Sequence, residues 1–185
     1  MFRAHIRESA SLHLLEERHA AEVFSLVDQD RAYLREWLPW VDATQTVDDT
    51  LSFIRSSLEQ FASNKGFVAG IWSERRFCGV IGTHKLDLLN RKGEIGYWLG
   101  KSFQGKGIMT DACRALVTHL LTEIDLNRVM IQCARENQKS CAVPRRLGFT
   151  EEGLAREAQL LHGNFHDLRQ FVMLKRDWKP EPGRL

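Results

Sequence analysis

The residues best placed to bind a charged ligand form a short glycine-containing segment, Gln104-Gly105-Lys106-Gly107. An alternating apolar pattern typical of a β-strand, residues 94–99, comes before it, and an amphipathic pattern typical of an α-helix follows it. A glycine turn between a strand and a helix exposes backbone N–H groups at the positive end of the helix dipole. We therefore expect this segment to bind a phosphate or diphosphate group.

Three interpretations of the segment are open at this point. Residues 100–106 fit the GxxxxGK part of a nucleotide-binding P-loop, but Gly107 stands where that motif needs Ser or Thr to hold Mg²⁺. In the second interpretation, Gly105 and Gly107 only make a tight turn. The third, a site for another phosphate-containing ligand, depends on further segments of the chain that are described below.

Composition and charge exclude several classes of protein. The chain has 185 residues, of which 43% are hydrophobic and 27% are charged, as in an ordinary globular domain. We expect a single domain over residues 1–178 and a frayed tail over residues 179–185, which contain two prolines. The net charge of +2, without a block of like charges, argues against nucleic acid or an anionic membrane as a partner.

Hydropathy and cysteine spacing indicate a cytoplasmic protein. The N-terminus lacks the apolar run of a signal peptide, and no stretch is apolar enough to span a bilayer. The four cysteines form no CxxC pair, so we expect reduced thiols. No spacing of histidines, cysteines and carboxylates indicates a metal site.

Apolar periodicity predicts a mixed α/β (α+β) protein with a largely antiparallel sheet. The expected strands are residues 11–15, 67–72, 77–84, 94–99, 128–133, a strand from residue 149 onward, and 167–174. A turn at Gly163-Asn164 is expected to join the last two strands. The expected helices are residues 16–28, 47–61, 109–124 and 137–148.

Capping residues predict where two of these helices begin. Thr46 is expected to cap the second helix, with Asp48 and Asp49 in its first turn, and Asn137 to cap the last. Pro144 falls inside the last helix and removes one hydrogen bond, so we expect a short or kinked helix. The residues that the second helix is expected to bury are Val47, Leu51, Ile54, Leu58 and Phe61.

Several further segments share their order and spacing with one family. They are Trp37-Leu38-Pro39-Trp40, Glu94 to Trp98, Gln104 to Ile108, Asn127-Arg128-Val129, Asn137 to Ser140 leading to Leu147-Gly148-Phe149, and the hairpin at Gly163. Together they resemble the GNAT superfamily of N-acetyltransferases, and within it the RimJ/RimL-type branch of ribosomal-protein acetyltransferases. The resemblance covers nearly the whole chain. It implies the GNAT fold, a mixed, mostly antiparallel central sheet with a splayed parallel strand pair, flanked by helices.

The resemblance also implies a place for acetyl-CoA as co-substrate, without a metal ion. The pantetheine arm is expected between strands 94–99 and 128–133, paired with their free backbone groups. The diphosphate is expected on the N–H groups of residues 104–109, where Met109 replaces the Gly or Ala of many relatives. The expected coenzyme contacts are Tyr97, Trp98, Leu99, Gln104, Gly105, Lys106, Gly107, Ile108, Met109, Thr110, Asn137 and Ser140.

By the same resemblance, catalytic roles are expected for Glu94 and Ser140. Glu94 is the leading general base, acting through water, and its alternative is a solvated residue at a strand start. Ser140 matches a serine that orients the leaving thiol or a water, and its alternative is a helix-capping hydroxyl. Cys133 matches a cysteine near the thioester in some relatives, although a buried cysteine more often only fills space. Gln159 stands where some relatives have a glutamate base, and Glu157 is expected on the same side of that strand; the substitution favours a water-mediated mechanism.

The acceptor is expected to be a primary amine in a cleft walled by Trp37 and Trp40, with Tyr97 beside them. The alternative place for these aromatic side chains is the core. Three histidines are weaker candidates for an acid or base, and the last two are expected at the surface beside the hairpin turn: His84, His162 and His166.

The chemistry of amines narrows the acceptor further. An α-amine with a pKa near 8 is about one-tenth neutral at pH 7, whereas a lysine near 10.4 is neutral in fewer than about one molecule in a thousand. We therefore expect a protein N-terminus, such as that of a ribosomal protein. The alternatives are a polyamine or aminoglycoside acceptor, or a non-catalytic CoA-binding regulatory protein. A homo-oligomer is also expected, since related proteins often form dimers.

Overall fold

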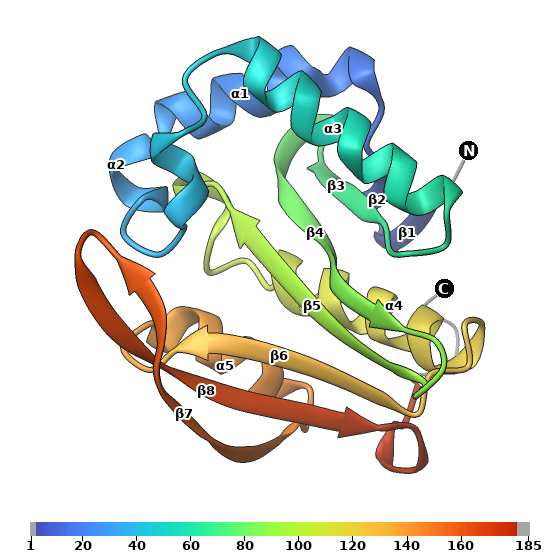
Figure 1. Cartoon of the computed structure of the whole chain (residues 1–185). Helices are drawn as coiled ribbons and strands as arrows, with labels where there is room; N and C mark the ends of the chain where they lie inside the picture. Colours follow the sequence, from blue (N-terminus) through green and yellow to red (C-terminus); the bar gives the residue numbers. More distant parts are fainter. Residues whose placement is uncertain (1–2, 181–185) are drawn as a thin grey trace.

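The computed structural model describes residues 3–180, which build one eight-stranded sheet with helices on both sides (Figure 1). The strand order is β1-β2-β3-β4-β5-β6-β8-β7. Neighbouring strands run antiparallel except β5 and β6, which run parallel. This confirms the predicted mixed, mostly antiparallel fold. Of the predicted tail, residues 181–185 lie outside the described residues.

The regular elements have the following bounds. The strands are β1 (Arg3–Arg7), β2 (Ala10–Leu14), β3 (Val68–Ser73), β4 (Arg76–Asp87), β5 (Lys92–Leu99), β6 (Arg128–Ala134), β7 (Thr150–Leu161) and β8 (Asn164–Leu174). The α-helices are α1 (Ala20–Gln29), α2 (Arg31–Leu34), α3 (Val47–Ala62), α4 (Ile108–Thr122) and α5 (Gln138–Arg146). The 3₁₀ turns are η1 (Glu17–His19), η2 (Pro39–Asp42), η3 (Lys101–Phe103) and η4 (Lys175–Asp177).

The N-terminal strand β1 lies outside the predicted elements. It pairs antiparallel with β2, with Ala4 opposite Leu12, and forms an edge of the sheet. Short edge strands carry little periodic signal, because polar and charged side chains are tolerated on them. The strand brings Arg7 beside the start of α4, where it becomes important for the site.

Helix α3 confirms its predicted start but not all of its predicted buried face. Thr46 and Asp49 form a capping box, in which Thr46 Oγ1 accepts from the Asp49 N–H at 3.3 Å and Asp49 Oδ2 accepts from the Thr46 N–H at 2.8 Å. Val47 and Phe61 are 39% and 45% exposed, so the expectation that both are buried is wrong. They lie in the first and last turns, whereas the contact with the core is made by the middle of the helix. The fully buried residues of α3 are Thr50, Ile54 and Ser57.

Helix α4 supplies much of the core, as its periodicity predicts. It contacts β1, β2, β4, β5 and β6, and lies behind the sheet in Figure 1, on the side away from α1 and α3. Its buried residues are Ile108, Met109, Ala112, Cys113, Ala115, Leu116, Val117, Thr118, Leu120 and Leu121. The helix ends at Thr122, two residues before the predicted end at Ile124, which is 39% exposed.

The C-terminal part contains the short helix α5 and the long β7–β8 hairpin. Helix α5 has nine residues and contains Pro144, as expected, and Asn137 caps it by accepting from the Ser140 N–H at 3.0 Å. The hairpin turn consists of His162 and Gly163, with φ of 49° and 80°. Two successive positive φ angles are typical of a tight two-residue hairpin turn. The predicted turn at Gly163-Asn164 is therefore one residue too late.

A bulge also alters the predicted alternation in β7. The pairing with β8 shifts register between Ala155 and Gln159, and Glu157 within this stretch has a φ of 51°. Side chains do not keep their alternation through a bulge. The regular alternation that the prediction for Glu157 and Gln159 assumed is therefore interrupted, and their shared side stays a prediction.

The two parallel strands separate part-way along their length. Pairing between β5 and β6 runs from Lys92 opposite Arg128 to Ile95 opposite Ile131, and stops there. Both strands continue, β5 to Leu99 and β6 to Ala134, each still paired with its other neighbour. The facing edges beyond Ile95 therefore carry backbone groups without a strand partner, as the predicted splay requires.

Candidate active site

A groove of about 930 Å³ lies along the end of β5, beyond the point where its pairing with β6 stops. It is lined by α2 and the turn after it, by the end of β5, by the glycine loop and first turn of α4, and by α5. Of the predicted coenzyme contacts, those that line it are Tyr97, Trp98, Leu99, Gln104, Gly105, Gly107, Ile108, Met109, Thr110, Asn137 and Ser140. Segments far apart in sequence thus meet in one cavity.

The glycine loop has a backbone that only glycine adopts easily. Gly105 and Gly107 have φ of 73° and 76°, in the left-handed region. Gly107 occupies the cap position of α4 and offers no side chain to the N–H groups of the first turn. Those N–H groups, at the positive end of a fifteen-residue helix, are suited to bind an anion.

Side chains from the glycine loop, α2 and α5 contact one another at the groove. The Gln104 side-chain amide donates to the Tyr33 hydroxyl of α2 and accepts from Lys139 Nζ of α5 at 3.3 Å. Lys139 Nζ also lies 5.8 Å from the centre of the Tyr33 ring. These contacts join the α2 side of the groove to its α5 side. Tyr33 and Lys139 were outside the predicted set, because nothing local in the sequence links them to Gln104.

The groove is electropositive. Its lining includes Lys101, Lys139 and Arg146, and among its described lining residues there is no Asp, Glu or His. Arg146 Nε donates to the Thr110 hydroxyl at 3.2 Å, which places this cation beside the first turn of α4. Such a lining favours a polyanionic ligand such as a diphosphate.

Ser140 lies in a small hydrogen-bonded cluster at the inner side of α5. Its hydroxyl lies 3.2 Å from the Cys133 sulfur and 3.5 Å from the Tyr97 hydroxyl, and Tyr97 donates to the Ser140 carbonyl at 3.0 Å. Removal from water raises the pKa of the Tyr97 hydroxyl well above its usual range. A hydrogen bond with Cys141 and burial raise the pKa of the Cys133 thiol. Both groups are therefore held protonated at neutral pH.

Three predicted site residues lie outside the groove lining. Lys106 belongs to the loop, but its Nζ lies over the Phe103 ring at 5.9 Å. Glu94 precedes the splay and is opposite Met130 in the paired part of β5. Trp40 is 37% exposed, and its ring lies 5.9 Å from that of Trp98, whereas Trp37 does line the groove.

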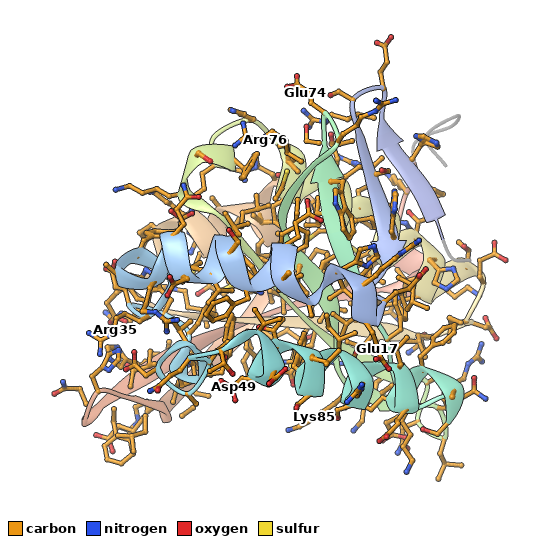
Figure 2. All side chains as sticks on the ribbon, turned by 90° about the horizontal axis from the view of Figure 1, so that it is seen from above. Glu17, Arg35, Asp49, Glu74, Arg76 and Lys85 are labelled. Atoms are coloured by element: carbon orange, nitrogen blue, oxygen red, sulfur yellow. The ribbon has the colours of Figure 1, made fainter. Side chains whose placement is uncertain are left out.

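The other residues weighed as acids or bases are dispersed. His84 is exposed, and a Cβ added at Gly96 would collide with its imidazole, so the ring lies over β5 between Glu94 and Trp98. His162 Nε2 lies 2.7 Å from the Arg35 carbonyl, beside α2, and His166 lies 3.7 Å from Glu136. Figure 2 labels Arg35 at that end of the molecule, near the hairpin.

Two further findings concern metals and membranes. Over residues 3–180, no cluster of three or more His, Cys, Asp or Glu side chains could hold a metal ion. Within the same described part of the chain, no helix is long and apolar enough to cross a membrane. The four cysteines are buried and form no disulfide.

Comparison with known proteins identifies close relatives. The acetyltransferase (GNAT) domain family matches residues 11–150. YdaF of Bacillus subtilis (strain 168), named as a ribosomal N-acetyltransferase, is 41% identical over 182 residues, which cover 98% of this chain and 100% of the relative. The ribosomal-protein-serine acetyltransferase of Escherichia coli (strain K12) is 32% identical over 171 residues, covering 91% of this chain and 94% of the relative.

A solved structure agrees with the sequence relatives. RimL, a ribosomal L7/L12 alpha-N-protein acetyltransferase in complex with coenzyme A, superposes with a TM-score of 0.91 at 29% identity, over 94% of this chain and 98% of that one. In that complex the coenzyme forms a disulfide with a cysteine of the protein.

Proposed function

This chain belongs to the acetyltransferase (GNAT) family, and from that premise we propose that it transfers the acetyl group of acetyl-CoA to a protein N-terminal α-amine. A ribosomal protein is the proposed acceptor, because relatives at 41% and 32% identity are named for ribosomal-protein acetylation. The relatives and the chain match over nearly their full lengths, so the proposal concerns the same unit in each.

The separation of β5 and β6 is the observation that carries the proposal. Beyond Ile95 and Ile131, two facing strand edges offer free N–H and C=O groups, and the glycine loop lies at the end of β5. An extended pantetheine arm satisfies such edges as an added strand would. The diphosphate of the same acetyl-CoA molecule would then bind at the N-terminus of α4. The tight-turn and P-loop interpretations leave the open strand edges without a ligand.

The acceptor chemistry begins with a neutral amine. Its nitrogen attacks the thioester carbonyl carbon, the C–S bond breaks, and the coenzyme sulfur takes up a proton as the amine nitrogen loses one. We assign the proton donor at sulfur to the Ser140 hydroxyl, which lies in the cluster with Cys133 and Tyr97. The thiol-to-cysteine link in the RimL complex supports a sulfur position near such a cysteine.

Removal of the amine proton is assigned to water positioned by Glu94. No carboxylate or imidazole is among the described residues lining the groove, which suits an α-amine because its pKa lies near 8. Glu94 and His84 lie on the same side of β5, the side opposite Tyr97, where an acceptor approaching through the splay would pass.

The charge of the groove weighs against the small-amine alternative. Polyamines and aminoglycosides carry several positive charges and favour carboxylate-lined sites. Here the α2 side of the lining offers the aromatic and apolar side chains of Tyr33, Leu34 and Trp37, and the described lining residues include no carboxylate. A single α-amine on an extended peptide requires fewer such partners.

A free-thiol release assay tests the proposal. Acetyl-CoA is offered with N-terminal peptides, with the same peptides blocked at the α-amine but carrying a lysine, and with spermidine and an aminoglycoside. We expect thiol release and a mass increase of one acetyl group only on free α-amines. Turnover of a polyamine with inert peptides would refute the acceptor assignment. Binding of acetyl-CoA without turnover on any amine would indicate the non-catalytic alternative.

A further inference from the structure

Arg7, the last residue of β1, binds the back of the glycine loop. Its Nη1 donates to the Lys106 carbonyl at 2.9 Å, and its Nε donates to Asp111 Oδ2 at 2.8 Å. Nη2 forms an ion pair with the same carboxylate. A Cβ built at Gly107 would lie 3.0 Å from Nη2, so the guanidinium also lies directly against that residue. One side chain thus contacts the loop and the first turn of α4.

The bond to the Lys106 carbonyl sets the direction of the next N–H group. In a trans peptide the C=O and the following N–H point in opposite directions. All described peptide bonds are trans, so holding the Lys106 carbonyl toward Arg7 turns the Gly107 N–H away from it. Gly107 lines the groove. Arg7 therefore orients a donor that the diphosphate is proposed to use.

The ion pair with Arg7 neutralises the Asp111 carboxylate, which lies close to the proposed diphosphate site. The Asp111 side chain is only 16% exposed and lies in the first turn of α4, where a carboxylate interacts well with the helix dipole. A diphosphate bound at that turn would be repelled by an unpaired carboxylate. The Arg7 guanidinium neutralises Asp111 from the sheet side and leaves the groove side electropositive.

We propose that Arg7 is a positioning residue for the coenzyme diphosphate, acting through the Lys106–Gly107 peptide and through Asp111. The proposal rests on the proposed function, since it requires acetyl-CoA in the groove. Arg7 is proposed to affect the affinity for the diphosphate of the coenzyme, whereas other residues carry out the acetyl transfer.

The test compares two acetyl donors in the Arg7→Met variant. Acetyl-CoA carries the diphosphate, whereas acetyl-pantetheine lacks it and retains the thioester. We expect KM and Kd for acetyl-CoA, the latter by calorimetry, to rise about tenfold, with kcat and the kcat/KM for acetyl-pantetheine close to wild type. The matched control is Arg55→Met, which removes a guanidinium paired with Glu17 at 2.9 Å on a distant surface; Figure 2 labels Glu17 beside α3.

Two further variants separate orientation from general stability. Arg7→Lys keeps the charge but cannot bind carbonyl and carboxylate as a fork, so we expect an intermediate Kd. Asp111→Asn removes the repulsive charge and keeps the carbonyl bond, so its Kd for acetyl-CoA is expected to be no higher than wild type. If Arg7→Met does not fold, these two variants carry the test.

The outcomes distinguish this inference from the proposed function. Equal losses with both donors, or a Kd raised as much by Asp111→Asn as by Arg7→Met, would mean that the pair only stabilises the fold, and the inference fails. Wild-type affinity for acetyl-CoA in Arg7→Met would also overturn it. If the wild-type protein itself binds no acetyl-CoA, the proposed function fails first.

Discussion

Replacing Gly107 by alanine tests the loop at its most constrained residue. Gly107 has a φ of 76°, where an L-residue costs about 1 to 2 kcal/mol. For a domain of this size, that loss lowers Tm by about 2 to 8 °C. The added Cβ would also lie 3.0 Å from Arg7 Nη2, tighter than an ordinary contact, so the guanidinium or the loop must move.

The effect on coenzyme binding follows from the hydrogen bond proposed between the Gly107 N–H and the diphosphate. A backbone N–H bonded to a charged phosphate contributes about 1.5 to 3 kcal/mol. Its loss corresponds to a rise in KM for acetyl-CoA of about 10- to 150-fold. KM is measured by thiol release at saturating peptide, and Kd for CoA by calorimetry.

Gly148→Ala provides the matched control. Gly148 has a φ of 77°, a Cβ there would meet nothing within 4 Å, and the residue lies after α5, outside the groove lining. Both variants are expected to lose similar stability, while only Gly107→Ala loses affinity. A KM within about twofold of wild type in Gly107→Ala, with the expected fall in Tm, would refute the assignment of the loop to the diphosphate.

Three further predictions concern catalysis and pH. Ser140→Ala is expected to lower kcat by about 100-fold with near-normal CoA affinity, in line with loss of a positioned acid; an unchanged kcat removes Ser140 from the mechanism. Glu94→Gln is expected to lower kcat about tenfold or more, unlike the control Glu74→Gln at the β3–β4 turn. Burial lowers the pKa of His119 from its usual value of 6.5. As the pH falls below about 6.5, the unfolded chain therefore takes up a proton at this histidine before the folded chain does, and the free energy of unfolding decreases. Chemical denaturation at pH 7 and pH 5.5 should show that His119→Gln loses less free energy of unfolding between these two pH values than the wild type does. An equal loss in both proteins would contradict the prediction.

The proposed coenzyme half of the site can be predicted from the sequence, because contacts between neighbouring residues determine its backbone. Gly105 and Gly107 are needed for their positive φ, and the apolar period of α4 places its N-terminus directly after them. Asn137 likewise caps α5 by a contact three residues along the chain. Each of these features depends on neighbours in sequence, which a pattern can register.

Contacts between distant residues leave no such pattern. Arg7 and Asp111 are 104 residues apart, and β1 is too short and too polar on one side to predict a partner. Val47 and Phe61 continue the apolar period of α3 but lie past its contact with the core. Periodicity marks a helix face, and the packing of the whole fold decides how much of that face is covered.

The segment proposed to bind the acceptor is also held by contacts between distant residues. His162, at the hairpin turn, lies 2.7 Å from the carbonyl of Arg35, which in turn binds Asp42 through two hydrogen bonds of 2.8 Å. This contact fastens the β7–β8 hairpin to the segment that carries Trp37 and Trp40. The width of the proposed acceptor cleft would therefore depend on a junction between residues 127 positions apart. A local pattern can indicate the glycine loop but not this junction, so the sequence predicts the coenzyme more readily than the acceptor.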